Sequence, residues 1–450
     1  MMNSDEKQET IQMSSVVIDG ILYEQTYNPE QRKVKYVFLE DNGKTIGAKI
    51  QVEHNGVIYK PILNADVTEK AIILPTYPMD YKSRKELMKD IKGHIHKYVD
   101  IPEIYEDVCT WYTMMTWLSD RMPSIPYLRF LGDYQTGKSR ASRVVTGLCY
   151  HPFQFVTPSG ASLYRTIERW KATLKLDESD FKYSDKTADI IRILNAGYEQ
   201  GNRVPRCSGD NYDNIRYFDV YGPKIIANKT IFKDPSLENR CITILMKQTT
   251  RDDIPRNLTD EFYKEQQTLR NKLLMWRLKN YNKVDISRAK KLNLNNIDIR
   301  LQQITEGIVS LFVDMPEVLE KMRKVFMMHH NKMVEAREDT LDGRIVKTLL
   351  ELKGEGKEHI TASDIADRIQ ENYDGYYSIK PSVIGRHMKK LGIETSAPRK
   401  VDGVSKRCVI WNEQLMQQLK KKFIRTKNYG TTEATVFQGG TIALLDNYIQ

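Results

Sequence analysis

The sequence predicts an α/β protein built around a three-layer domain with a parallel β-sheet, and two observations favour this fold class. Over residues 125–256, five short apolar stretches alternate with stretches of helical spacing. This alternation is typical of a parallel sheet with helices on both faces. The regions before and after it have different patterns, and a chain of 450 residues has room for about three domains.

The flanking regions are predicted in chain order. Residues 14–80 show short alternating runs between Asp-Gly and Asn-Gly turns, which indicates a small β-rich region. Residues 81–124 have helical spacing, and we interpret their Trp and Met stripe as core rather than as a ligand surface. The predicted division is a disordered lead 1–13, a β-rich N-terminal domain 14–80, a helical segment 81–124, the α/β core 125–256, a helical lid 257–338, a C-terminal domain 339–427 and a tail 428–450.

Composition excludes several classes of protein. With 40% hydrophobic and 28% charged residues the chain can bury a core, so wholesale disorder is excluded. The five cysteines include no CxxC pair, which argues against a disulfide scaffold or a zinc site. A polar start and the lack of an apolar run of about 18 residues predict neither a leader nor a membrane span. We therefore expect a cytoplasmic protein.

The basic charge is concentrated near the C-terminus. Residues 379–427 contain 13 Lys or Arg and 3 Asp or Glu, a local balance of +10 that equals the formal net charge of the whole chain. A basic segment on an otherwise balanced protein indicates a polyanionic partner, most simply nucleic acid. The alternative is a solvated basic surface.

A complete GxxxxGKS motif is the sharpest chemical signal. It lies between a strand-like YLRFL and a helix-like SRASRVVTGL, the order that a phosphate-binding loop requires. Its backbone N–H groups would surround phosphates, Lys138 would neutralise them and Ser139 would hold Mg²⁺. The expected nucleotide-binding residues are Gly132, Asp133, Tyr134, Gln135, Thr136, Gly137, Lys138 and Ser139.

Polar residues follow two later strands. The strand TLKLD ends in Asp177, an expected Mg²⁺ ligand, and Glu178 would polarise the water that attacks the γ-phosphate. A solvated strand end is the alternative, and Lys175 departs from the apolar pattern of a buried strand. Asn228 ends the strand KIIAN, where it would orient that water or simply serve a turn.

Arg240 follows a short helix and precedes the last strand of the α/β region. It would reach the nucleotide of a neighbouring subunit as an arginine finger. The alternative is an ordinary cation at a helix C-terminus.

The ordered set GDYQTGKS, SLYRTIERW, TLKLDESD, YGPKIIANK and SLENRCITILM resembles the AAA+ ATPases, specifically the MCM-like helicase ATPases of phages and mobile elements. The resemblance covers residues 125–306. It implies that Lys138 and Ser139 belong to Walker A, Asp177 and Glu178 to Walker B, that Asn228 is sensor 1, and that Arg240 is the arginine finger. It also implies a sensor 2 contact from Arg300 to the γ-phosphate, although Thr305-Glu306-Gly307 replace the family's apolar ending.

A basic hairpin is expected between the Walker B helix and sensor 1. Two β-like stretches flank a Ser-Gly-Asp-Asn turn, and their arginines interleave with aromatic residues, a combination that grips phosphates and stacks bases. The candidate DNA contacts are Arg203, Arg206 and Arg216, next to Tyr212, Tyr217 and Phe218. MCM-like motors carry a DNA-gripping hairpin at this point of the chain, and a purely structural hairpin is the alternative.

The C-terminal domain predicts three helices and a hairpin, the winged-helix arrangement. Its third helix and wing carry the expected phosphate contacts to duplex DNA, and protein contacts are the alternative use of such a domain. These residues are Lys380, Arg386, Lys389, Lys390, Arg399, Lys400, Lys406 and Arg407.

Together these features predict an ATP- and Mg²⁺-dependent DNA motor. We expect a ring, with six subunits as the expected number, that translocates a single DNA strand through its channel while the winged helix binds duplex. One alternative is a replication initiator or helicase loader that binds duplex without unwinding it. The other is a DNA-binding switch that binds ATP without turning it over.

Overall fold

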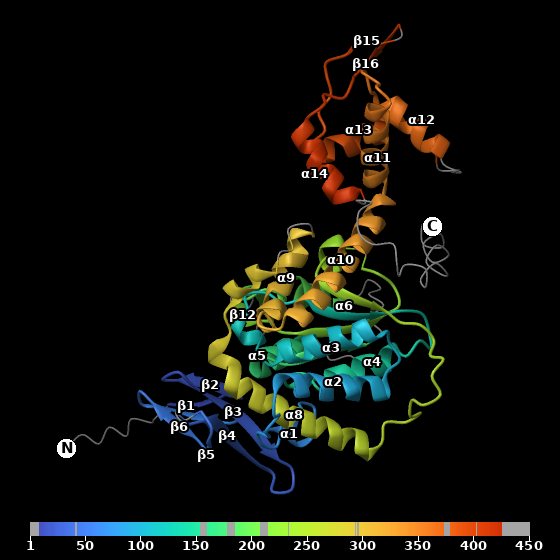
Figure 1. The fold of residues 1–450 in the computed structure, drawn as a ribbon. Coiled ribbons are helices and arrows are strands. Elements are labelled where there is room, and N and C mark those ends of the chain that lie inside the picture. The colour runs from blue at the N-terminus through green and yellow to red at the C-terminus, as the bar shows by residue number, and fades with distance from the viewer. Residues whose placement is uncertain are drawn as a thin grey trace, which may run out of the picture. The chain divides into compact units, whose positions relative to one another are not determined.

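A computed structural model describes residues 9–40, 43–153, 160–177, 185–207, 215–232, 234–292, 294, 297–372, 379–401 and 403–424. The chain forms two compact units, residues 1–327 and 328–450. The β-rich region, the helical segment and the α/β core all lie in the first unit (Figure 1). The finer boundaries given above stay predictions. No helix in the described part of the chain is long and apolar enough to cross a membrane.

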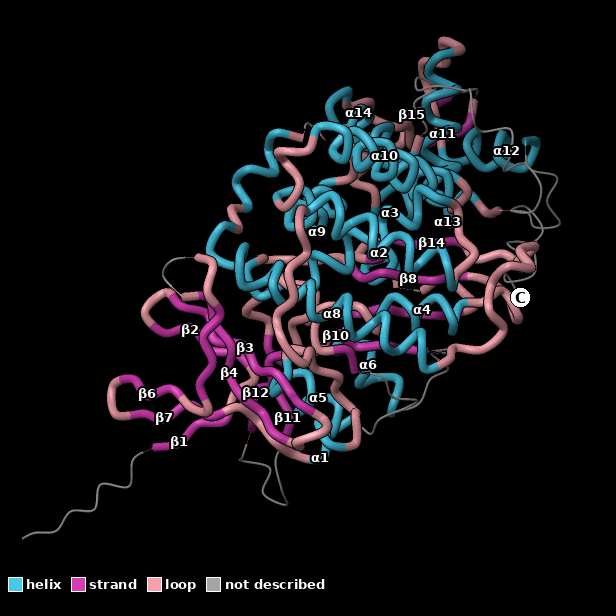
Figure 2. The backbone as a smooth tube through the Cα atoms, turned by 60° about the horizontal axis from the view of Figure 1, so that its bottom comes forward, coloured by secondary structure: helices cyan, strands magenta, loops and turns pink. Residues whose placement is uncertain are grey.

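Two small sheets form the N-terminal region. The antiparallel sheet has the order β2 (Ser15–Ile18), β3 (Ile21–Asn28), β4 (Lys33–Leu39), β5 (Ile46–Lys49). The other sheet contains β1 (Glu9–Gln12), β7 (Val57–Lys60) and β6 (Val52–His54), and α1 (Ala65–Thr68) follows it. Figure 2 shows these strands as a group apart from β8 and β14.

Residues 9–12 correct the expected disordered lead. They form strand β1, which pairs in parallel with β7 from Glu9–Val57 to Gln12–Lys60. The next residue, Met13, donates its N–H to the Lys60 carbonyl and accepts the Tyr36 hydroxyl at 2.7 Å. Main-chain pairing with a distant strand therefore orders a polar segment whose own sequence has little apolar content.

The predicted parallel sheet is confirmed. Its strands are β8 (Tyr127–Leu131), β9 (Pro152–Phe153), β10 (Thr173–Asp177), β13 (Lys224–Asn228) and β14 (Cys241–Leu245), in the order β14-β8-β13-β10-β9, with every neighbouring pair parallel. The strands are almost entirely buried, as strands covered on both faces must be. Lys224 fits this interior because its ammonium donates to three carbonyl oxygens, those of Gly197, Val220 and Gly222.

The strand order determines the layers. The helices between strands are α4 (Lys138–Thr146), α5 (Gly160–Trp170), α6 (Asp185–Ala196) and α7 (Pro235–Glu238). The connection through α4 leads from β8 to β9, toward the β9 edge of the sheet. The connections through α5, α6 and α7 each lead toward the β14 edge. Because such crossovers are right-handed, α4 covers one face and α5, α6 and α7 cover the other. Between α6 and β13 lies the hairpin of β11 (Arg203–Cys207) and β12 (Ile215–Asp219).

Further helices cover the α4 side. They are α2 (Arg84–Tyr98), α3 (Glu103–Thr116), the short 3-10 helix η1 (Ser119–Arg121) and α8 (Asp260–Asn280), with α2, α3 and α4 lying side by side in Figure 1. The region expected as a lid also contains η2 (Tyr281–Lys283), η3 (Ile286–Lys291), α9 (Ile299–Ser310) and α10 (Pro316–Glu338).

Helix α8 lies along the core rather than standing apart from it as a lid. Its Gln266 donates to the Val144 carbonyl at 2.8 Å, and Arg270 donates to the Gly147 carbonyl at 2.7 Å. Arg277, also on α8, is buried and binds Glu24 of β3 at 2.7 Å and Asp120 at 2.8 Å. These buried polar contacts fasten α8 to both α4 and the N-terminal sheet, because each would leave an unpaired buried group if it were broken.

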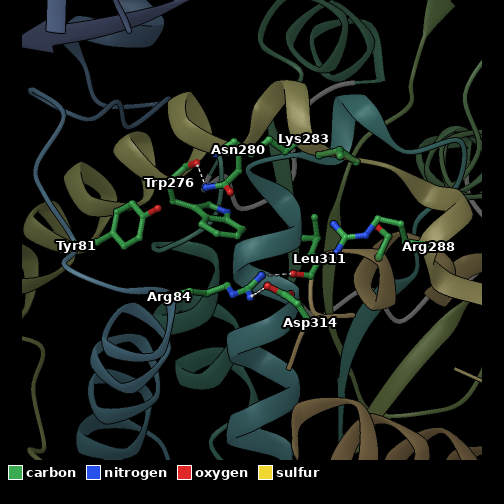
Figure 3. A pocket seen from close by; sticks show the side chains of 10 residues that line it. Tyr81, Arg84, Trp276, Asn280, Lys283, Arg288, Leu311 and Asp314 are labelled. Atoms are coloured by element: carbon green, nitrogen blue, oxygen red, sulfur yellow. Dashed lines mark hydrogen bonds and ion pairs between the residues drawn. The ribbon is translucent and has the colours of Figure 1, made fainter. Parts of the chain in front are cut away.

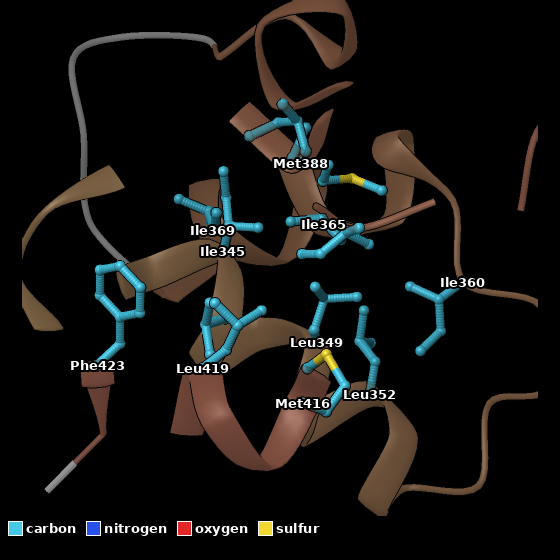
Figure 4. Close-up of a cluster of buried hydrophobic side chains, with 14 residues drawn as sticks. Ile345, Leu349, Leu352, Ile360, Ile365, Ile369, Met388, Met416, Leu419 and Phe423 are labelled. Atoms are coloured by element: carbon cyan, nitrogen blue, oxygen red, sulfur yellow. The ribbon is translucent and has the colours of Figure 1, made fainter. Parts of the chain in front are cut away.

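The second unit has its own hydrophobic core (Figure 4). Its elements are α11 (Leu341–Gly354), α12 (Ala362–Asn372), α13 (Pro381–Lys390), β15 (Arg399–Val401), β16 (Val404–Lys406) and α14 (Glu413–Phe423). Three helices and a hairpin thus occur in the expected order. Helix α14 was not expected, and it contributes Met416, Leu419 and Phe423 to the core at helical spacing.

Candidate functional site

The candidate site lies at the carboxyl end of the parallel sheet, where β8 passes through a loop into α4. Gly137 takes a φ of +81° at the N-cap of α4, a conformation that favours glycine. A Cβ on Gly132 would lie 2.7 Å from the Met246 carbonyl oxygen and 2.9 Å from the Thr136 hydroxyl. Both glycines of the motif are therefore required by the backbone, as in a loop that wraps phosphates.

Side chains of the loop are held by local contacts. Thr136 donates its hydroxyl to the Asp133 carbonyl at 2.8 Å, and the Lys138 ammonium donates to the same oxygen. The Lys229 ammonium lies 4.1 Å from the Tyr134 ring centroid and 3.2 Å from the Asp133 carboxylate. The Tyr134 N–H, together with Lys229, holds the pKa of the Asp133 carboxyl below its usual value. Gln135, the remaining loop residue, has a φ of +61°.

Ser139 and Asp177 meet although they are 38 residues apart in the chain. The Ser139 hydroxyl donates to the Asp177 carboxylate at 3.0 Å, which joins the first turn of α4 to the end of β10. Lys175, which broke the apolar pattern of this strand, is buried and places its ammonium 3.3 Å from the same carboxylate. The pairing brings together the two groups expected to bind Mg²⁺, and it explains the lysine in the strand.

Asn228 is the last residue of β13, and β13 lies between β8 and β10 in the sheet. It is buried, and its side-chain amide donates to the Thr230 carbonyl at 2.8 Å. Its Oδ1 atom is buried without a partner among the described residues. A buried amide oxygen without a donor is costly, so this position suits a water or ligand that supplies one.

A hollow of about 410 Å³ opens beside Ser139. Its lining includes Arg140 and Arg143 of α4 and Arg256, with no acidic residue among the seven that line it. Arg140 donates to the carbonyl oxygens of Pro255 and Arg256, which holds the segment before α8 against the loop. Tyr263 of α8 is 49% exposed at the rim. This basic surface was not predicted. The sequence did contain a signal for it, because Arg140 and Arg143 follow the motif directly and are three residues apart.

The described part of the chain has no group of three or more His, Cys, Asp or Glu side chains that could hold a metal ion. This does not count against Mg²⁺, which proteins bind through one or two carboxylates together with substrate phosphates. The Ser139–Asp177 pair and the orphaned Asn228 oxygen fit such a site. Glu178, the expected catalytic base, lies outside the described residues.

Arg240 and Arg300 lie at the opposite end of the sheet from the phosphate loop. Both guanidinium groups lie over the Tyr198 ring, at 4.2 and 5.3 Å from its centroid. The carbonyl of Tyr198 accepts the N–H of Ile125, and the carbonyl of Arg240 accepts the N–H of Tyr127, at the start of β8. The length of β8, roughly 16 Å, separates this cluster from the loop.

The expected γ-phosphate contact of Arg300 has no support from this placement. Its guanidinium donates to the Tyr198 hydroxyl at 3.1 Å and to Gln303 at 2.9 Å, far from the phosphate loop of its own chain, and a contact with a γ-phosphate stays a prediction. Arg240 is 8% exposed and donates to the Asn195 amide oxygen. As a finger for a neighbouring subunit it would have to leave Asn195 and Tyr198, and that role stays a prediction.

The expected hairpin is present, but two of its arginines bind acidic residues of the chain. Arg206 lies opposite Arg216 in the register of β11 and β12. The Arg206 guanidinium contacts Asp189 at 2.5 Å, and that of Arg216 contacts Glu168 at 2.7 Å. Arg203 and Tyr217 are exposed, and Tyr212 lies outside the described residues. These ion pairs reduce the positive charge that the hairpin offers to a strand of DNA.

The basic residues of the second unit are mostly on its surface. Lys380, at the N-cap of α13, is exposed, as are Arg386, Lys389 and Lys390 on that helix and Arg399, Lys400 and Arg407 around the hairpin; Lys406 is half-buried. Lys390 lies 3.2 Å from Asp342, and Arg399 contacts His359 at 3.1 Å. Helix α14 adds the exposed Lys420, Lys421 and Lys422, which were not among the predicted contacts.

No protein-family model and no curated protein matches the chain. Several solved structures resemble it at low scores. The NrS-1 C-terminal region has a TM-score of 0.37 with 12% identity over 87% of this chain and 97% of that one. The active helicase Cch of SCCmec type IV has a TM-score of 0.42 with 12% identity over 90% and 95%. The JCV helicase has a TM-score of 0.26 with 14% identity over 51% and 66%.

Proposed function

We propose that this chain binds and hydrolyses ATP with Mg²⁺ at the carboxyl end of its parallel sheet, as an ATPase of the AAA+ type. The observation that carries the proposal is the 3.0 Å hydrogen bond between the Ser139 hydroxyl and the Asp177 carboxylate. It joins the end of a glycine loop with the GxxxxGKS pattern to an acidic strand end. Ligands of open α/β sheets bind at this end of the strands.

Each residue has a role that follows from its position. Lys138 and the N–H groups at the start of α4 would bind the β- and γ-phosphates. Ser139 and Asp177 would hold Mg²⁺, which supplies positive charge to the phosphate oxygens when it is bound. Asn228 would position the attacking water through its side-chain amide, and Glu178 would accept a proton from that water.

We infer that hydrolysis drives movement on DNA. In this proposal the subunits form a ring, with six as the expected number, and the β11–β12 hairpin contacts a single strand in the channel. The exposed basic residues of α13 and of the β15–β16 hairpin would bind duplex phosphates. The protein would therefore act as a DNA-associated helicase.

One observation favours a second candidate, a replication initiator or helicase loader. Arg206 and Arg216 are paired with Asp189 and Glu168, whereas Arg386 and Lys389 on α13 have no ion partner among the described residues. The charge available for DNA is thus greater on the surface assigned to duplex than on the hairpin. A protein that binds duplex without unwinding it would show this balance.

Strand displacement from a forked duplex separates the two candidates. A motor releases the labelled strand only with ATP and Mg²⁺, and substituting Asp177→Asn abolishes the release. An initiator or loader binds the duplex region and hydrolyses ATP without releasing either strand. The Glu168→Gln and Asp189→Asn variants sharpen the test, because freeing Arg216 and Arg206 should raise single-strand affinity if the hairpin contacts DNA.

A further inference from the structure

A second cavity, of about 330 Å³, lies in the first unit away from the phosphate loop. Its lining comes from the loop before α2, the start of α2, the end of α8, the η2–η3 segment and the end of α9 (Figure 3). No lining residue belongs to residues 132–139 or to α4. The proposed ATP site makes no use of this cavity.

The charge of the cavity is unbalanced. Its lining contains three basic residues, Arg84, Lys283 and Arg288, and one acidic residue, Asp314. The acid is already engaged, because the Arg84 guanidinium binds its carboxylate and also donates to the Leu311 carbonyl at 2.7 Å (Figure 3). Lys283 and Arg288 have no hydrogen bond to an acidic side chain among the described residues. Two positive charges therefore remain available at the rim.

Arg288 and Asp314 line the same cavity, and the charge of Arg288 affects the pKa of that carboxyl. Burial raises this pKa, but the hydrogen bond and charge of Arg84 lower it more, and the charge of Arg288 lowers it further. The carboxyl is thus held below its usual range and stays ionised. Arg288 acts on it from η3, on the other side of the cavity from α2 (Figure 3).

Two buried donors of the lining lack acceptors. Trp276 is 3% exposed, and its indole N–H has no partner among the described residues. The Nε atom of Arg84 is likewise buried without a partner in the described part of the chain. Both atoms have almost no accessible surface, so a ligand would reach them only after a small shift of the lining side chains. A buried donor without an acceptor costs about 1–3 kcal/mol, which favours such a contact with an acceptor-rich ligand.

We propose that this cavity binds the phosphate group of a nucleotide. A phosphate supplies several acceptor oxygens and negative charge, which match the orphaned donors and the free cations of the lining. The proposal does not rest on the ATP site, because the two cavities share no residue.

Size and aromatic content point to one nucleotide unit rather than to a bare ion. About 330 Å³ is at the lower end of the range for small-molecule pockets, so it suits a single phosphorylated unit. Tyr81 and Trp276 form an edge-to-face pair with ring centroids 6.2 Å apart on the side opposite Arg288 (Figure 3). They give the sugar or base an apolar wall. Either a free mononucleotide or one nucleotide of a strand offers this chemistry.

The test uses the full chain with Lys138→Ala, so that the phosphate loop does not contribute to binding. Three probes are titrated: inorganic phosphate, adenosine monophosphate, and an oligothymidylate of about 12 nucleotides. The test variant adds Lys283→Gln and Arg288→Gln. Its matched control adds Lys290→Gln, which removes an exposed cation of the same η3 segment outside the cavity.

We expect the test variant to bind adenosine monophosphate about tenfold more weakly than the control, as for the loss of charge-assisted hydrogen bonds. If only the oligothymidylate is affected, with a reduced salt dependence, the phosphate belongs to a strand. If inorganic phosphate is the only probe that the control binds, and the test variant no longer binds it, the nucleotide part of the proposal is wrong. Equal binding of all three probes by test variant and control overturns the proposal.

A second variant addresses the indole donor. Trp276→Phe keeps an aromatic ring at this position but removes the unpaired N–H together with the rest of the five-membered ring. It should weaken adenosine monophosphate binding by a few fold, and because the side chain is buried, its melting temperature should also fall and is measured alongside. Unchanged affinity of this folded variant for every probe would show that the indole donor does not meet a ligand.

Discussion

The two ends of the parallel sheet differ in what they hold. At the carboxyl end, Ser139, Asp177 and Asn228 come together from three elements, and the Asn228 oxygen is left without a donor among the described residues. At the amino end, Arg240 and Arg300 lie on Tyr198 with polar partners of their own chain. At the first end a buried acceptor lacks a donor, whereas at the second end both arginines have polar and aromatic partners, although the Arg240 Nε atom is buried without a partner among the described residues. The contrast agrees with the proposal that a nucleotide binds at the carboxyl end.

The strongest test of this contrast removes the cation of the loop. Lys138→Ala should lower ATP turnover by about 10³-fold, because charge stabilisation of the phosphates is lost. A steady-state ATPase assay measures it, with Lys264→Ala as the control for an exposed lysine on α8. Turnover of Lys138→Ala at the control rate would remove the loop from the site.

The next test concerns the Ser139–Asp177 pair. Asp177→Asn keeps the shape of the side chain but removes its charge, so we expect turnover to fall by about 10²-fold and the Mg²⁺ requirement to rise. Asp252→Asn is the control, because this exposed carboxyl lies outside the phosphate loop, α4 and β10. Magnesium titrations of both variants measure the effect. Equal requirements in the two would contradict the assignment of Asp177.

At the amino end the expected effect is on stability. Arg240→Ala leaves Asn195 without its donor and Tyr198 with Arg300 as its remaining cation, and we expect the free energy of unfolding to fall by about 1–3 kcal/mol. ATP binding by the same chain should not change. Denaturant unfolding and nucleotide titration measure the two quantities, and weaker ATP binding without lost stability would reverse the contrast.

Mixing the Arg240→Ala and Lys138→Ala proteins tests the trans role of Arg240. Neither protein alone would have a complete interface if Arg240 acts on a neighbour. In a mixed ring, a Lys138→Ala subunit can offer its Arg240 to the intact loop of an Arg240→Ala subunit. Partial recovery of ATPase activity supports the trans role. A mixture that assembles without recovery leaves Arg240 with the structural role alone.

A further expected effect concerns pH and involves neither end directly. Burial lowers the pKa of His94 to about 4 and that of His151 to about 3. Between these values and about 6.5 the unfolded chain binds more protons than the folded chain, so stability falls as the pH decreases. The slope should reach about 1.4 kcal/mol per pH unit for each histidine. Between pH 4 and 6.5 the free energy of unfolding of His151→Asn should change less steeply with pH than that of His359→Gln. The second variant is the control, because it changes an exposed histidine.

Features with a local signature could be predicted from the sequence. The glycine loop, the alternation of strands and helices and the β11–β12 hairpin each depend on residues near one another in the chain. Asp177 and Asn228 could be placed because the ends of parallel strands meet at one edge of a sheet. Even Lys175, which looked out of place, follows from its ion pair with Asp177.

Features that depend on distant partners could not be predicted. Arg240 received its role from its place before the last strand and Arg300 from resemblance alone, whereas both guanidinium groups lie on Tyr198, which neither argument includes. Strand β1 forms only because β7 pairs with it. The charge of the hairpin could be counted from the sequence, but its pairing with Glu168 and Asp189 depends on how α5 and α6 pack.

The most direct test of the account is ATP binding and hydrolysis by Glu178→Gln compared with the unsubstituted chain, with and without single-stranded DNA. The unsubstituted chain should hydrolyse ATP and do so faster with DNA. Glu178→Gln should bind ATP with unchanged affinity and hydrolyse it at least about 10²-fold more slowly, because the base that activates water is lost. Normal hydrolysis by Glu178→Gln, or no ATP binding by the unsubstituted chain, would contradict the proposal that the carboxyl end of the sheet is an ATPase site.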